Sequence, residues 1–142
     1  MILLWTYTRD TRLTQDEKCR HLVEKCLDAL LQFQTQFFQI DNFDLLLLVQ
    51  TCKHVQQDPI LSQNNTFISK LMHQMRLLDA QALASIDLMS IHEFVTIATF
   101  YLSLLSEGVC SKALAEAFLS KIQESLSEFN ELQLVLFKTS LE

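Results

Sequence analysis

Glycine and proline are nearly absent from this sequence, with one of each among 142 residues. Turn-rich β folds need both residue types at their corners, whereas the leucine, glutamine, alanine and glutamate that are common here favour continuous helices. The composition therefore predicts an all-α fold. A chain of this length is large enough to bury a core as one domain.

An excess of positive charge and a long apolar run are also missing. Eleven basic and 17 acidic residues give a net charge of −6, which disfavours general attraction to nucleic acids or anionic membranes. The longest apolar run, residues 45–49, is far shorter than the ~18 residues that span a bilayer. The apolar start, residues 1–5, is too short for a secretion signal. We expect an intracellular protein with no membrane insertion.

The four cysteines lack the density and spacing of a secreted disulfide framework. This pattern predicts a reducing compartment, with core thiols at Cys19, Cys26, Cys52 and Cys110.

Motifs for catalysis and cofactor binding are lacking as well. The four histidines include no pair four residues apart, and the sequence has no nucleophile elbow or phosphate-binding loop. The sequence therefore predicts no catalytic, cofactor-binding or metal-binding residues and no small-molecule substrate, so we expect a protein that is not an enzyme.

What is present is a series of helix signals, and the clearest is the stretch 41–52. Asp41 is a residue type that caps helix N-termini. The leucines that follow it would make every side of the helix apolar, so we expect other elements to cover this helix from two directions. Asp58 and Pro59 should end it, because the residue before a proline avoids the helical region. Ser90 and Glu93 have the spacing of a capping box before a second apolar helix, which Gly108 should stop.

Three other segments have the apolar spacing of amphipathic helices, with residues 79–84 as a candidate extension of the second. The segment 15–36 is predicted to turn inward Cys19, Leu22, Val23, Cys26, Leu27, Leu30 and Leu31. After Pro59 the inward residues are predicted to be Phe67, Ile68, Leu71, Met72, Met75 and Leu78. In the segment 111–126 they are predicted to be Leu114, Ala117, Phe118, Ile122 and Leu126. Large apolar residues between the first segment and Asp41 predict a packed exit at Phe33, Phe37, Phe38 and Ile40.

These helices contain an internal repeat. The sequences at 67–71 and 118–122 match position for position, and 22–26 fits the same frame. The repeat predicts one domain, residues 1–142, of stacked antiparallel helical pairs in an α-solenoid-like array, with pairs at about 1–38, 41–88 and 90–126 and a half-repeat at 128–142. A compact helical bundle is the alternative architecture.

The acid-led apolar helices that start at Asp44, Glu93 and Glu131, with the opening Leu3-Leu4-Trp5-Thr6-Tyr7, resemble the octotricopeptide-like repeats of the FAST kinase and RAP-domain families. This resemblance implies a mitochondrial or plastid location and a role in an organellar ribosome or RNA-processing complex. The chain differs from that pattern in its acidic charge and in having no evident RAP domain or transit peptide. The cytoplasm is the alternative location.

The function predicted from these observations is a non-enzymatic scaffold that mediates macromolecular assembly with protein partners or by self-association. Its candidate partner-facing ends are Ile2, Leu3, Trp5, Leu134, Phe137 and Leu141. One alternative is direct binding of single-stranded RNA, with phosphate contacts at Arg9, Arg12, Lys18, Arg20, Lys25, Lys70 and Lys121. Another is a compact helical regulator of protein interactions. The three lysines that share a repeat position, Lys25, Lys70 and Lys121, have a structural interpretation as well, in which their stems line the edge of the apolar stripe.

Overall fold

The computed structural model describes the backbone of residues 2–37 and 41–142, and the side chains of residues 4–29 and 41–142. Within these ranges the secondary structure is entirely helical, which confirms the all-α prediction. The predicted packed exit at Phe33, Phe37, Phe38 and Ile40 lies outside the described side chains. The α-helices are α1 (Ile2–Arg9), α2 (Thr11–Thr14), α3 (Glu17–Phe37), α4 (Asn42–Gln57), α5 (Asn65–Leu77), α6 (Asp79–Ser85), α7 (Ile91–Ser103), α8 (Lys112–Glu124) and α9 (Glu131–Leu141). Four short 3-10 helices connect them: η1 (Leu61–Gln63), η2 (Ile86–Leu88), η3 (Leu105–Glu107) and η4 (Leu126–Glu128).

The chain divides into two compact units, Met1–Met75 and Arg76–Glu142. The boundary between them falls inside α5 (Asn65–Leu77). The stacking of all the helical pairs into a single solenoid domain stays a prediction.

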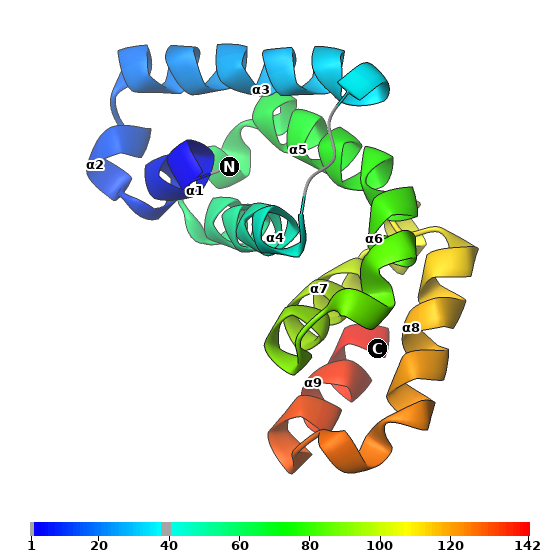
Figure 1. The fold of residues 1–142 in the computed structure, drawn as a ribbon. Helices are drawn as coiled ribbons and strands as arrows, with labels where there is room; N and C mark the ends of the chain where they lie inside the picture. Colours follow the sequence, from blue (N-terminus) through cyan, green and yellow to red (C-terminus); the bar gives the residue numbers. More distant parts are fainter. Residues whose placement is uncertain (1, 38–40) are drawn as a thin grey trace. The chain divides into compact units, whose positions relative to one another are not determined.

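In the first unit, α1 lies against α4 (Figure 1), and an ion pair links α3 to α5. The leucines of α4 are buried on every side, as a helix covered from two directions requires. Two polar contacts join α3 to the α5 region. Lys70 Nζ lies 2.8 Å from Asp28 Oδ1, and the Asn64 amide donates a hydrogen bond to Glu24 Oε1 over 3.1 Å.

Both ends of α4 lie where the sequence predicts. Asp41 accepts a hydrogen bond from the backbone N–H of Asp44 at 2.8 Å, which satisfies one of the free amides of the first turn. The helix ends at Gln57, directly before Asp58 and Pro59.

In the second unit, α7 packs against α9 and α6 packs against α8 (Figure 1). Phe94 of α7 lies at the centre of an aromatic cluster. Its ring centroid is 5.8 Å from those of Phe118 and Phe129 and 5.9 Å from that of Phe137. Such pairs contribute more than the burial of their area alone, so this cluster is the main core of the unit.

The capping box at Ser90 and Glu93 is confirmed, with hydrogen bonds of 2.9 and 3.2 Å in the two directions. Gly108 has the predicted left-handed conformation, with φ 71°. It ends η3 rather than α7, because α7 stops at Ser103 and a 3-10 turn intervenes. Residues 79–85 likewise form a separate helix, α6, instead of extending α5.

Several residues predicted to face inward are exposed. In α3 only Val23 and Leu27 of the described stripe are buried, while Leu22 is 59% exposed and Cys26 is exposed, so the core thiol prediction is wrong for Cys26. The buried stripe is narrower than the apolar one, because Leu22 and Cys26 each point ~100° away from their buried neighbours. Leu126 is 52% exposed, since α8 ends at Glu124 and the tighter 3-10 turn of η4 directs this side chain outward.

Candidate interaction surfaces

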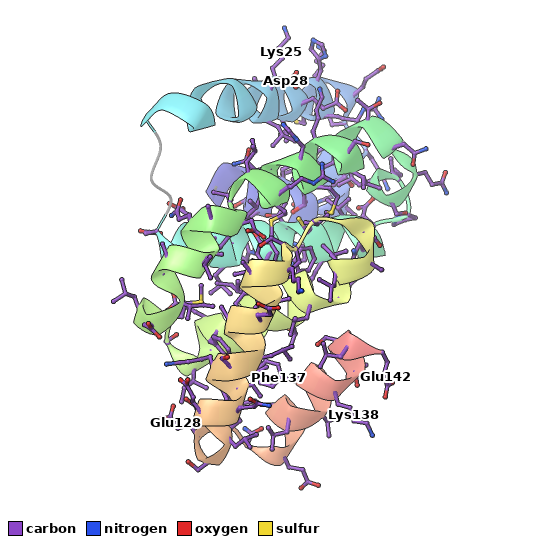
Figure 2. The ribbon with its side chains drawn as sticks, turned by 90° about the vertical axis from the view of Figure 1, so that its right-hand side faces the viewer. Lys25, Asp28, Glu128, Phe137, Lys138 and Glu142 are labelled. Carbon is purple, nitrogen blue, oxygen red and sulfur yellow. The ribbon has the colours of Figure 1, made fainter. Side chains whose placement is uncertain are left out.

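The basic residues predicted to contact polyanions are mostly engaged with other groups of the chain. Four of the seven form ion pairs with carboxylates: Arg12 with Asp10 (3.0 Å), Arg20 with Glu17 (3.7 Å), Lys70 with Asp28 (2.8 Å) and Lys121 with Asp87 (3.6 Å). The guanidinium of Arg9 lies 4.9 Å from the centroid of the Trp5 ring. Lys18 and Lys25 are exposed, and Figure 2 shows Lys25 extending outward from α3.

Six of these residues belong to the first unit and Lys121 to the second. The contact between Arg12 and Asp10 is the most specific, because the Arg12 Nε and Nη2 atoms donate to different oxygens of the same carboxylate. Hydrogen bonding from Arg12 lowers the pKa of Asp10. A phosphate at any of these four cations would compete with the carboxylate already beside it.

Two of the repeat lysines have equivalent surroundings. Lys70 in α5 follows the buried Phe67 by three residues, and Lys121 in α8 follows the buried Phe118 by three. Each lysine is half-buried, and its ammonium group reaches a carboxylate. This arrangement matches the structural interpretation, in which the stem packs at the edge of the core and the charge stays near the surface. Lys25, the third of the set, is exposed.

The residues predicted to face a partner differ in their placement. Leu141 is 48% exposed, whereas Trp5 and Leu134 are half-buried. The side chains of Ile2 and Leu3 lie outside the described residues. Phe137 is only 3% exposed, so its assignment to a partner-facing end is wrong. It points into the unit beside α8 (Figure 2) and packs on Phe129 at 5.2 Å between ring centroids.

The apolar surface of α9 is formed instead by three residues that the sequence analysis did not single out. Leu132, Val135 and Leu136 are 68%, 52% and 44% exposed. Their spacing places them on one side of the helix, opposite Phe137. We call these three residues the α9 stripe. The spacing is visible in the sequence, but α9 is apolar nearly all round, so the sequence alone does not indicate which side packs against α7.

Charged residues flank the α9 stripe on one side. Glu131 and Lys138 are seven residues apart, which is about 20° short of two helical turns, so they share a flank next to Val135. Both are exposed, and Lys138 projects from α9 away from Phe137 (Figure 2). The surface is therefore an apolar stripe with one charge of each sign along its edge.

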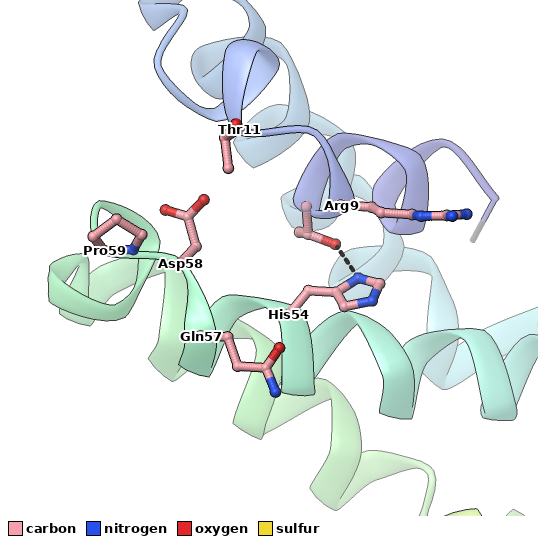
Figure 3. Close-up of a pocket in the computed structure, with 7 residues that line it drawn as sticks. Arg9, Thr11, His54, Gln57, Asp58 and Pro59 are labelled. Carbon is pink, nitrogen blue, oxygen red and sulfur yellow. Dashed lines mark hydrogen bonds between the residues drawn. The ribbon is translucent and has the colours of Figure 1, made fainter.

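A small polar pocket of 170 Å³ lies in the first unit, between the end of α1 and the end of α4 (Figure 3). Its lining residues are Thr8, Arg9, Thr11, His54, Gln57, Asp58 and Pro59. Pockets for drug-sized ligands are usually 300–1,000 Å³. This pocket has room only for a small group.

Three side chains of the pocket, Thr8, His54 and Asp58, take part in contacts within the fold. Thr8 Oγ1 donates to the carbonyl of Trp5 at 3.1 Å and lies 3.4 Å from His54 Nδ1. Burial lowers the pKa of His54, with a further contribution from Arg9. The Thr8 hydroxyl therefore lies between the backbone of its own helix and the His54 ring of α4.

Asp58 also lines the pocket, and its carboxylate accepts three hydrogen bonds. The Thr14 hydroxyl donates to Oδ2 at 3.0 Å, and the backbone N–H groups of Ile60 and Leu61 each donate to Oδ1 at 2.9 Å. These bonds tie α2 to the turn that follows α4. We therefore assign Asp58 a structural role.

Among the described residues, no three His, Cys, Asp or Glu side chains come close enough together to hold a metal ion. No helix in the described part of the chain combines the length and apolar character needed to cross a bilayer. Comparisons with protein-family models, curated proteins and solved structures found no match to this chain.

Proposed function

We propose that this chain is a non-enzymatic helical scaffold that binds a protein through the α9 stripe. The observation that carries the proposal is the exposure of Leu132, Val135 and Leu136 side by side on one helix whose opposite side is core. Complete burial of such a side chain contributes about 1.5–3 kcal/mol. Because the three are already partly covered, a partner would gain less than the full amount, but still enough to favour association.

The distribution of exposed apolar residues in the second unit supports the same function. Its exposed large apolar residues lie on several elements, but only α9 places three of them at helical neighbour positions. Contiguous apolar surface of this kind is typical of interaction sites, whereas single exposed leucines are common on any protein.

The resemblance to octotricopeptide-like repeats favours an organellar assembly, such as a ribosome or an RNA-processing complex, as the setting of this scaffold. The alternative, direct binding of single-stranded RNA, is disfavoured by the net charge of −6 and by the four cations already paired with carboxylates. If the chain does bind RNA, a filter-binding series should show steep salt dependence. No binding at low salt would rule that alternative out.

The scaffold proposal can be tested by affinity purification of the tagged chain from its native source. Leu132→Asp combined with Val135→Asp should abolish the co-purification of partner proteins, because charges placed on the stripe cannot be desolvated cheaply. Leu88→Asp is the matched control, since Leu88 is 79% exposed, lies in the same unit and is outside the stripe. Far-UV circular dichroism would verify that both variants fold. The proposal is wrong if the stripe variant retains the same partners as the control.

A further inference from the structure

The charges beside the α9 stripe are complementary to those of a second copy in one orientation. Glu131 lies in the first turn of α9 and Lys138 in the last, both on the flank next to Val135. When two identical helices pack antiparallel about a twofold axis, the same flank of each helix meets, with the directions reversed. Glu131 of each copy then lies opposite Lys138 of the other copy, so the interface contains two such pairs.

The apolar contacts fit the same register. A twofold axis midway between residues 134 and 135 brings Val135 within one residue of its own copy, ~1.5 Å along the helix, and brings Leu132 equally close to level with Leu136 of the other chain. The same axis brings Glu131 level with Lys138 of the other chain, because the two positions lie equally far from it along the helix. In a parallel pair, the charged flank would instead face the flank that carries Gln133 and Ser140, and neither ion pair would form.

We propose that two copies of this chain associate through their α9 helices, antiparallel, with the α9 stripe at the centre and two Glu131–Lys138 ion pairs at the edge. This inference rests on the proposed function, because it names the partner of the same stripe. The contact is small: α9 has 11 residues and is ~16 Å long, whereas stable dimers bury about 1,200–2,000 Å². The association is therefore weak and reversible, with a Kd on the order of 100 µM.

Charge reversal gives a direct test of the orientation. Glu131→Lys puts two lysines on the flank and Lys138→Glu puts two glutamates there, so each variant should repel its own copy. Sedimentation equilibrium of the full chain from 10 µM to 1 mM should show the Kd of each variant raised about tenfold. An equimolar mixture of the two should return to within about twofold of the unaltered chain, because both ion pairs re-form between unlike copies.

Loss of folding would not imitate this pattern, since two unfolded variants would not restore each other. The proposal is overturned if the single variants associate like the unaltered chain, or if the mixture associates no better than its components.

Cross-linking supplies a second readout of the register. In a Cys26→Ser background, which removes the exposed native thiol, Val135→Cys should be joined to its own copy by a short bismaleimide. Leu88→Cys, exposed but outside the stripe, should not be. Equal cross-linking at the two positions would contradict the proposal.

The outcomes separate this inference from the proposed function. A monomeric chain that still loses a different partner when Leu132 and Val135 become Asp would disprove self-association and leave the scaffold function intact. If the variant with Leu132→Asp and Val135→Asp still self-associates and still binds its partners, both the self-association proposal and the scaffold proposal are wrong.

Discussion

Asp58 shows how much of the first unit depends on one side chain. Asp58 is 6% exposed, and its carboxylate accepts hydrogen bonds from a hydroxyl and two backbone N–H groups in different parts of the chain. A buried donor without a partner costs about 1–3 kcal/mol, so removing one acceptor affects several donors at once.

Replacing Asp58 with alanine should therefore lower the free energy of unfolding by about 2–4 kcal/mol. Asp58→Asn is the matched control, because its amide oxygen can still accept the two backbone bonds, and it should cost about 1 kcal/mol or less. Urea denaturation at neutral pH measures both. If both variants lose the same free energy of unfolding, then Asp58 does not stabilise the fold through its hydrogen bonds to the backbone.

Tyr7 gives the first unit a dependence on alkaline pH. Burial raises the pKa of Tyr7 from 10.0 to about 12. Its hydroxyl is buried with no hydrogen-bond partner among the described residues. Above pH 10 the unfolded chain releases this proton more readily than the folded one, so the stabilisation is complete below pH 10 and is lost as the pH rises toward 12.

Burial also raises the pKa of Cys52 to about 12 and that of Cys110 to about 11, both from 9.0. The unaltered chain should thus lose stability from pH 9 upward. Tyr7→Phe should lose less between pH 10 and 12 and should be at least as stable at pH 7, since the unpaired hydroxyl is gone. Urea denaturation across this pH range tests the prediction, and parallel curves for the two proteins would contradict it.

At the scale of single helices, the sequence predicts where a helix begins and ends better than it predicts which side of the helix is buried. Asp41, Ser90 and Pro59 act through backbone groups within a few residues, so the bounds of α4 and the start of α7 could be predicted from local rules. The orientation of Leu22, Leu126 and Phe137 depends on which neighbour packs against each helix, and the apolar pattern does not contain that information.

The candidate interaction surface was predicted only in part for the same reason. The sequence pointed to α9 as a partner-facing end but placed Phe137 on the outside, where the structure has the α9 stripe. Likewise, the basic residues were visible in the sequence, whereas their carboxylate partners Asp28 and Asp87 come from other elements and depend on the tertiary structure.

Gly108 is the described residue with a positive φ, and its replacement isolates the cost of that conformation. A Cβ at this position would meet nothing within 4 Å, so Gly108→Ala introduces backbone strain without a clash. The variant should lose about 1–2 kcal/mol of stability. Gly108→Asn should lose less, because asparagine tolerates the left-handed region. Thermal unfolding followed by circular dichroism distinguishes the two, and an unchanged Gly108→Ala would contradict the assignment.

At the scale of the whole molecule, each unit has a core made by its own residues. The three aromatic partners of Phe94 all belong to the second unit. Native proteins open in cooperative parts, and such parts coincide with groups of residues that pack on one another.

Phe94→Ala should destabilise the second unit by about 3–5 kcal/mol. In hydrogen exchange followed by mass spectrometry, we expect the loss of amide protection to be concentrated in residues 79–142 and to be small in α1 and α4. Uniform loss along the chain would show that the two units unfold as one.

The position of the unit boundary inside α5 has a consequence for biosynthesis. The first unit ends at residue 75, so all of its residues have been made before those of the second unit, which follow at roughly 5–20 residues per second. Starting a helix is costly, whereas lengthening one is not. Arg76 and Leu77 therefore join a helix that the first unit already holds, so the second unit begins to form on a template instead of starting from a free chain as it emerges from the ribosome.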